Sequence, residues 1–251
     1  MVVGAHLAPV NGPPVATFYA PGAWTDRVEL DEGAARHATV KRLAVGDPVR
    51  LTNGIGLRAH ARIDTIGKRS LVLECISSSF EVVEAPARLE LWAPVGDRDR
   101  MLWLAEKAVE LGVTAWRSVV YRRSRSVNPR GEGDAFREKL LARMISALEQ
   151  CSGAWLPELL SEATIQDVAE CTHVGGTILL DPFGPPLAEL MPTVHAPVAL
   201  ALGPEGGLEP DERAVFSDAG WRTASLGVNV LRFETAGIAG VTLVRSLLQS
   251  P

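Results

Sequence analysis

The sequence predicts a small β-barrel followed by an α/β domain whose sheet is mostly parallel, and three patterns carry this prediction. Apolar and polar residues alternate over 57–63, which is the signature of a half-buried strand. Continuous apolar runs at 177–180 and 198–202 are typical of strands that are covered on both faces. Segments of helical periodicity, 99–111 and 136–150, alternate with strand-like runs, as a parallel sheet requires.

Residues up to about 85 are interpreted as the barrel. The alternation of the first strand repeats at Leu71, Leu73 and Cys75, and turn residues 52–54 precede that first strand. A helix is expected around 32–43, and several short strands with frequent turns favour a small barrel. The segment 80–86 is the expected boundary. The expected domains are residues 1–85 and residues 86–251.

The second part opens with a strand expected at 89–93, followed by the helix over 99–111. The apolar residues of this helix share one face, and Gly112 stands where a C-terminal cap belongs. Residues 115–121 are expected to form the next strand, and residues 236–248 the closing helix. Strands that alternate with helices in this way predict an open α/β sheet.

Composition limits the class of protein. The chain has 251 residues, of which 47% are hydrophobic and 22% charged, as in an ordinary globular protein. No run approaches the roughly 20 apolar residues of a membrane span, and the start lacks the features of a secretion signal. The three cysteines show no CxxC spacing and the five histidines are scattered. We therefore expect a cytoplasmic protein with no membrane segment, disulfide framework or metal site.

The formal net charge of −5 conceals an uneven distribution. Residues 98–143 carry 11 basic and 6 acidic side chains, whereas residues 144–251 carry 4 and 13. Screening limits the reach of each charge to about 10 Å at 0.1 M salt, so a basic segment can bind phosphates even in an acidic protein. The densest basic cluster, at 121–125, is interpreted either as an RNA-binding surface or as a solvated face.

Two loops of the second domain indicate a ligand site. The first, Gly203-Pro204-Glu205-Gly206-Gly207, directly follows the apolar run at 198–202. It lacks the Gly-Lys-Ser/Thr end of a P-loop, and no dinucleotide-binding glycine pattern opens a helix early in the domain. Glycines let backbone approach a ligand closely, and ligands of open α/β sheets bind beyond the carboxyl ends of strands. Alone, this loop is equally consistent with a structural turn.

The second loop, residues 226–231, follows another strand-like segment and leads into a helix. Val230 and Leu231 are apolar residues in a loop, which suits contact with a flat ring such as adenine. Glu234 and Thr235 stand where a helix N-terminus favours an acid and a cap. Alone, this segment is also explained as a capped core helix with a surface ion pair.

Together the two loops resemble those of the SPOUT-class methyltransferases that methylate N3 of a uridine in small-subunit (16S) ribosomal RNA. That family carries a loop like 203–207 and a C-terminal loop like Leu226-Gly227-x-x-x-Leu231-Arg232-x-Glu234-Thr235-Ala236. Weaker similarities occur at 106–113 and at 147–153. The resemblance runs through the chain in order, because residues 37–49 also look like part of the family's N-terminal domain.

The chain departs from the family pattern at three places. Val228-Asn229 stands where the family commonly has Pro-Arg, and Phe233 where it has a small residue. Ala154 stands where the family commonly has an arginine. The two lost basic positions bear on RNA recognition, whereas cofactor binding would rest largely on backbone groups.

The resemblance implies a PUA-like β-barrel followed by a SPOUT domain with a trefoil knot, an exception to the rule that chains do not thread loops. It also implies S-adenosylmethionine as the cofactor, and a homodimer that acts on 16S rRNA or the small ribosomal subunit without a metal. The implied cofactor-binding residues are Leu180, Leu202, Gly203, Pro204, Glu205, Gly206, Gly207, Leu226, Gly227, Val230, Leu231, Arg232, Thr235 and Ala236.

Three charged residues are the catalytic candidates that follow from this resemblance. Uridine N3 carries a proton whose pKa lies well above neutral, so a base must accept it or a cation must stabilise the anion. Arg232 would stabilise charge on the oxygens of the base, and Glu205 or Glu234 would orient the base or accept the proton. The expected RNA-binding residues are Arg58, Arg62, Arg122, Arg123 and Arg125.

Three alternative functions stay open. Another SPOUT enzyme, acting on a ribose 2′-hydroxyl or on transfer RNA, would carry similar loops and differ in its product nucleoside. A catalytically inert RNA-binding factor of ribosome assembly would fit the missing basic positions and would lack affinity for the cofactor. A small-molecule α/β enzyme would use the glycine loop for a phosphate, but the P-loop lysine is missing.

Overall fold

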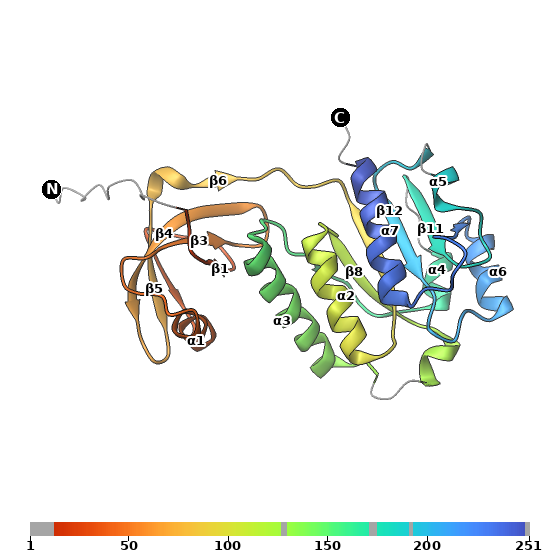
Figure 1. The fold of residues 1–251 in the computed structure, drawn as a ribbon, viewed down its shortest axis with the longest axis horizontal. Coiled ribbons are helices and arrows are strands. Elements are labelled where there is room, and N and C mark those ends of the chain that lie inside the picture. The colour runs from red at the N-terminus through yellow and green to blue at the C-terminus, as the bar shows by residue number, and fades with distance from the viewer. Residues whose placement is uncertain (1–12, 127–129, 171–174, 191–192, 249–251) are drawn as a thin grey trace. The chain divides into compact units, whose positions relative to one another are not determined.

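The computed structural model describes residues 13–126, 130–170, 175–190 and 193–248. Contacts within the chain divide it into two units, and Figure 1 labels the elements of both. The first unit joins Met1–Ala85 to Leu148–Leu156, and the second joins Pro86–Ala147 to Pro157–Pro251. Neither unit is therefore one continuous stretch of sequence.

The first unit is built on a curled sheet of six strands. All neighbouring strands run antiparallel except the first pair, which is parallel. The predicted alternation is confirmed, because Ala59, Ala61 and Ile63 are buried while the residues between them are partly exposed. In order of pairing the strands are β1 (Thr17–Tyr19), β3 (Pro48–Thr52), β4 (Leu57–Ile66), β5 (Leu71–Cys75) and β2 (Arg27–Leu30), with β6 (Glu81–Val82) paired to β4.

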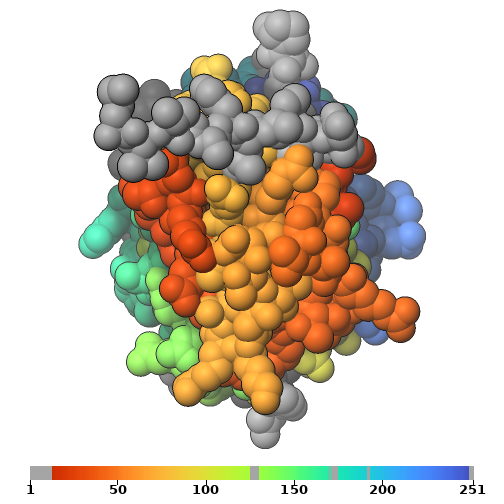
Figure 2. Space-filling model, turned by 90° about the vertical axis from the view of Figure 1, so that its left-hand side faces the viewer, coloured from red at the N-terminus to blue at the C-terminus, as the bar shows by residue number. Residues whose placement is uncertain are grey.

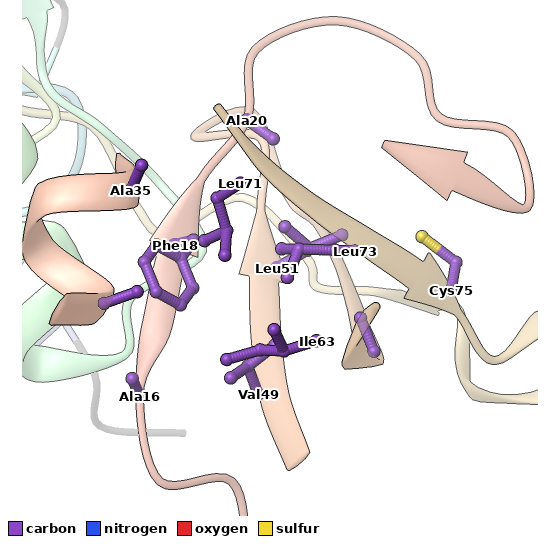
Figure 3. Close-up of a cluster of buried hydrophobic side chains, with 12 residues drawn as sticks. Ala16, Phe18, Ala20, Ala35, Val49, Leu51, Ile63, Leu71, Leu73 and Cys75 are labelled. Carbon is purple, nitrogen blue, oxygen red and sulfur yellow. The ribbon is translucent and has the colours of Figure 1, made fainter. Parts of the chain in front are cut away.

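The core of this unit lies between the sheet and one helix, α1 (Glu32–Val40). The helix begins after Asp31, whose side chain accepts a hydrogen bond from Ala34 N at 3.0 Å. Figure 3 shows Phe18 and Leu71 among the side chains that point into this core. A short 3₁₀ turn, η1 (Ser77–Ser79), follows β5. In Figure 2 the red-to-orange surface belongs to this unit.

Residues 148–156 join the first unit through specific contacts. Glu149 Oε1 accepts a hydrogen bond from Tyr19 N at 2.9 Å, and the hydroxyls of Thr17 and Ser152 lie 3.0 Å apart. Trp155 donates from its indole nitrogen to backbone carbonyls of residues 83 and 84. The segment 147–153, which resembles a family motif, therefore includes residues that support the barrel.

The second unit contains a seven-stranded sheet in which every pairing is parallel, and the predicted mostly parallel sheet is thus confirmed. Strands β7 and β12 are buried along their whole length, and for β12 this agrees with the continuous apolar run at 198–202. The other predicted run, in β11, is buried only from Ile178 onward. In order of pairing the strands are β10 (Ala163–Thr164), β8 (Ala115–Val120), β7 (Leu89–Pro94), β12 (Val198–Leu202), β11 (Gly176–Leu180) and β13 (Arg222–Ala224), with β9 (Glu158–Leu159) paired to β8.

Helices cover both faces of this sheet. On one face α7 lies against α2. A Cβ placed on Gly240 would come within 2.5 Å of Leu180 Cδ1, so a larger residue there would require the leucine side chain to shift. On the other face α4 and α6 enclose a cluster that includes Trp92, Phe216 and Trp221. The helices are α2 (Arg98–Glu110), η2 (Arg122–Ser126), α3 (Asp134–Cys151), α4 (Ile165–Ala169), α5 (Leu187–Leu190), α6 (Pro210–Asp218) and α7 (Phe233–Leu248).

The predicted helices over 99–111 and 136–150 are confirmed as α2 and α3. The closing helix begins at Phe233, three residues before the expected start, and α6 was not expected. Among the helices that the structure describes, none is both long enough and apolar enough to span a lipid bilayer.

Candidate functional site

A cavity of about 570 Å³ opens in the second unit where three neighbouring strands end. The loops that follow β11, β12 and β13 form its walls. Its volume lies within the range of roughly 300–1,000 Å³ that is usual for small-molecule sites. The lining residues are 180–183, 202–208, 224–227, 229–231, Arg123, Pro210, Arg213, Phe233 and Ala236.

The cavity brings together every predicted cofactor-binding residue except Arg232 and Thr235. The early start of α7 explains these two exceptions. Phe233 and Ala236 stand three positions apart, on one face of the helix, and both line the cavity. Arg232 and Thr235 each precede one of these residues, and both are exposed. The roles of all these residues in binding stay predictions.

The glycine loop at 203–207 is held in shape by its neighbours. Gly207 N donates to Pro204 O at 2.8 Å and closes the turn. Arg123 also braces the loop, because its guanidinium donates to Gly206 O and, at 2.8 Å, to Glu209 Oε1. At Gly203 an added Cβ would only reach ordinary contact, 3.4 Å from Leu208 Cγ. Gly203 is therefore a position where a methyl group can be added with little disturbance of the fold.

The two predicted catalytic carboxylates occupy different environments. Glu205 lines the cavity, and its Oε1 lies 3.4 Å from the Asp97 backbone nitrogen at the start of α2. Glu234 is buried beside the cavity without lining it, and its Oε1 lies 3.8 Å from Arg100 Nε. Its Oε2 has no hydrogen-bond partner among the described residues. Arg100 is a charged neighbour that sequence reasoning missed, because only the folded chain brings α2 and α7 together.

The predicted RNA-binding cluster is tied to acidic residues of α6. Arg122 donates through both terminal nitrogens to Asp211, at 3.2 and 2.5 Å, and this pair raises the pKa of Arg122 and lowers that of Asp211. The backbone nitrogen of Arg122 donates to the buried Glu212 Oε1 at 2.8 Å. Arg125 lies in the same 3₁₀ turn, and its side chain is outside the part of the chain that the structure describes.

The two predicted arginines of the barrel both lie on β4 of the first unit. Arg58 donates to Ser152 O at 3.2 Å and to Glu81 Oε1 at 3.0 Å. Arg62 donates to Gly46 O at 3.3 Å and stays partly exposed. Intramolecular partners therefore hold the described arginines of the predicted RNA surface in both units.

Several cavity-lining residues were not predicted from the sequence, and Asp181, Phe183 and Arg213 are among them. Asp181 and Phe183 belong to the segment Asp181-Pro182-Phe183-Gly184, whose residue types are those of a tight turn. That signal was available in the sequence. Within the described ranges, no three His, Cys, Asp or Glu side chains are grouped so that they could hold a metal ion.

Two family patterns match the chain, one within the first unit and one mostly within the second. Residues 83–245 match the RNA methyltransferase domain, and residues 30–75 match the RNA methyltransferase PUA domain. The chain belongs to the RNA methyltransferase family. The cavity therefore lies in the part of an RNA methyltransferase that carries its methyltransferase domain.

Curated relatives of this RNA methyltransferase extend over most of its length. It is similar to the ribosomal RNA small subunit methyltransferase E of Rickettsia conorii, with 28% identity over 83% of this chain and 84% of the relative. It is also similar to the protein of the same name from Mycobacterium tuberculosis, with 27% identity over 86% of this chain and 84% of the relative.

Solved structures confirm the fold class. The ribosomal RNA small subunit methyltransferase E of Neisseria gonorrhoeae, bound to S-adenosylmethionine, superimposes with a TM-score of 0.82 and 25% identity, over 92% of this chain and 97% of that chain. A putative methyltransferase from Legionella pneumophila, also with bound S-adenosylmethionine, gives a TM-score of 0.79 and 26% identity, over 92% and 96%. The PUA-like first part and the parallel-sheet second part are thus both as predicted.

Proposed function

We propose that this chain transfers a methyl group from S-adenosylmethionine to N3 of a uridine in 16S ribosomal RNA. The observation that carries the proposal is the cavity at the ends of β11, β12 and β13, which gathers both glycine loops in an RNA methyltransferase domain. Two similar solved structures contain S-adenosylmethionine, and the curated relatives are small-subunit rRNA methyltransferases. These likenesses support the choice of cofactor and of substrate.

The residues of the cavity fit this cofactor. Leu226, Val230 and Leu231 supply an apolar loop that would hold the adenine ring. Gly203 and Gly207 would let backbone approach the ribose and methionine portions. When bound, the cofactor supplies a methyl group that its sulfonium already activates. The protein then has mainly to bind, orient and exclude water.

Transfer to N3 also requires that the N3 proton leave the uracil ring. Glu205 lines the cavity, so we assign it the role of accepting that proton or orienting the base. Glu234 is buried outside the cavity, so its role would be to position Arg100. Arg232 is exposed beside the loop and would stabilise negative charge on the base oxygens only if the RNA approaches from that side.

The remaining assignments belong to the same proposal. Arg122, Arg123 and Arg125, together with Arg58 and Arg62, would contact phosphates of the RNA. Residues 1–85 would form the RNA-binding domain and residues 86–251 the methyltransferase domain. The protein would act in the cytoplasm as a homodimer, on 16S rRNA or on the small ribosomal subunit.

The product nucleoside tests this function. Purified protein is incubated with S-adenosylmethionine and small ribosomal subunits that lack the methyl group, and the digested RNA is analysed by mass spectrometry. We expect 3-methyluridine. A 2′-O-methylated nucleoside, or transfer only to transfer RNA, would instead identify another SPOUT activity. RNA binding without any methyl transfer would favour an inert assembly factor.

A further inference from the structure

One aromatic ring stands open at the rim of the cavity. Phe183 follows β11, lines the cavity and is 82% exposed, whereas the other exposed aromatic residues, Trp103 and Phe80, are 46% and 39% exposed. Single exposed apolar side chains are common on proteins and need no explanation by themselves. The way in which the structure fixes this ring is the second observation.

Phe183 is carried on a turn with little freedom. Asp181 is buried, its Oδ1 accepts a hydrogen bond from Phe183 N at 3.0 Å, and its carbonyl accepts one from Gly184 N at 3.1 Å. Prolines at 182 and 185 flank the tip of the turn. An added Cβ at Gly184 would lie 2.6 Å from Ala224 N, so the turn is pressed against the next strand. The backbone that carries the ring is therefore held in place.

The same carboxylate also holds a cation against the ring. Arg213 Nε donates to Asp181 Oδ2 at 2.8 Å, and Arg213 Nη1 donates to Leu208 O at 2.8 Å. The guanidinium carbon lies 5.0 Å from the centre of the Phe183 ring, within the range of a cation–π contact. One face of the ring is thus covered by Arg213, and the high exposure of the residue leaves the opposite face open.

We propose that the open face of Phe183 stacks on the uracil that is to be methylated; this inference rests on the proposed function. Methyl transfer requires the reacting atoms to lie about 3–3.5 Å apart, so the target base must enter the mouth of the cofactor cavity. An enzyme that acts on a base draws it out of its stack, and aromatic side chains replace the lost stacking. Phe183 stands at that mouth, already oriented and with one face free.

The test compares variants at this position in the methyl-transfer assay with small ribosomal subunits. Phe183→Ala should lower kcat/KM for the RNA roughly 10- to 100-fold, the loss expected when one base–aromatic stack is removed. Phe183→Tyr should retain activity because it keeps the ring, whereas Phe183→Leu should lose it although it keeps the apolar volume. The affinity for S-adenosylmethionine, measured by calorimetry, should stay unchanged in all three. Trp103→Ala is the matched control, an exposed aromatic away from the cavity.

Each other outcome contradicts the inference in a distinct way. Equal kcat/KM for Phe183→Ala and wild type would overturn it, as would equal loss in the Phe183→Tyr and Phe183→Leu variants. If Phe183→Ala lowered the affinity for S-adenosylmethionine by the same factor as kcat/KM, the ring would contact the cofactor and not the uracil. A change in sedimentation coefficient would assign it to contact with a second copy of the chain. Failure of the wild-type protein to transfer methyl groups would refute the proposed function itself, and with it this inference.

Discussion

Arg122 and Asp211 form a two-pronged ion pair, with nitrogen–oxygen distances of 3.2 and 2.5 Å, that ties the basic cluster to the start of α6. The two side chains are 60% and 62% exposed, so the pair lies in water and is weak. A phosphate that binds Arg122 therefore competes with Asp211 at little cost. On the proposed RNA surface, a phosphate of the RNA would take the place of the Asp211 carboxylate as the partner of Arg122.

Asp211→Asn should strengthen RNA binding, because it frees the positive charge of Arg122. The slope of the logarithm of affinity against the logarithm of salt concentration should steepen by about one unit, and Arg122→Ala should make it shallower by a similar amount. Filter binding of a 16S rRNA fragment at several salt concentrations measures both slopes. Asp218→Asn, at the other end of α6, changes the net charge equally and serves as the control. Identical slopes in the Asp211 and Asp218 variants would contradict the assignment.

Arg245→Leu should destabilise the second unit. The buried guanidinium of Arg245 donates to Ala87 O at 2.7 Å and to Gly112 O at 2.5 Å. Its loss leaves two carbonyls without their donor, at about 1–3 kcal/mol each, so we expect the free energy of unfolding to fall by about 2–6 kcal/mol. Urea unfolding followed by circular dichroism measures this value. Thr242→Ala, at an exposed position of the same helix, should lower the free energy of unfolding much less. An equal decrease in the two variants would show that the two hydrogen bonds of Arg245 do not account for its effect.

Glu149→Gln should make the stability of the first unit less dependent on pH. Burial raises the pKa of Glu149 above its ordinary value of 4.5, so the folded chain holds this proton more tightly than the unfolded chain. The resulting stability is present below pH 4.5 and is lost as the pH rises through the higher folded pKa. The glutamine oxygen can still accept from Tyr19 N. Thermal unfolding gives the midpoint of each protein at pH 4 and at pH 7. The midpoint of the variant relative to that of the wild type should be higher at pH 7 than at pH 4. The same difference in midpoint at both pH values would contradict this.

Local patterns in the sequence predicted the parts of the fold that are set by residues close together in the sequence. The alternation of β4 and the positive φ of +75° at Gly112 after α2 are of this kind. The composition of each of the two loops was also consistent with a purely structural role, and their joint resemblance to one family is what placed them together around a cofactor. The structure shows a cavity that both loops line.

Contacts between distant segments could not be predicted in this way. The partner of Arg122 lies on α6, a helix that was not expected, and 89 residues separate the two. The start of α7 at Phe233 puts a buried ring at the first position of the helix, and Arg232, one residue earlier, is exposed and does not line the cavity. Residues 148–156 join the first unit because Glu149 accepts from Tyr19, a contact across 130 residues of sequence.

Calorimetric titration with S-adenosylmethionine tests the central claim, that the cavity beyond β11, β12 and β13 holds this cofactor. We expect the wild-type protein to bind it and Gly203→Val to lose that binding, with Gly203→Ala in between. Because a Cβ at this position makes only ordinary contact with Leu208, Gly203→Ala should keep the thermal unfolding midpoint of the wild type. The midpoint of Gly203→Val is measured as well, so that a loss of binding is scored only in a folded variant. Absence of binding by the wild type, or full binding by a folded Gly203→Val variant, would show that the glycine loop is structural scaffold and would contradict the account.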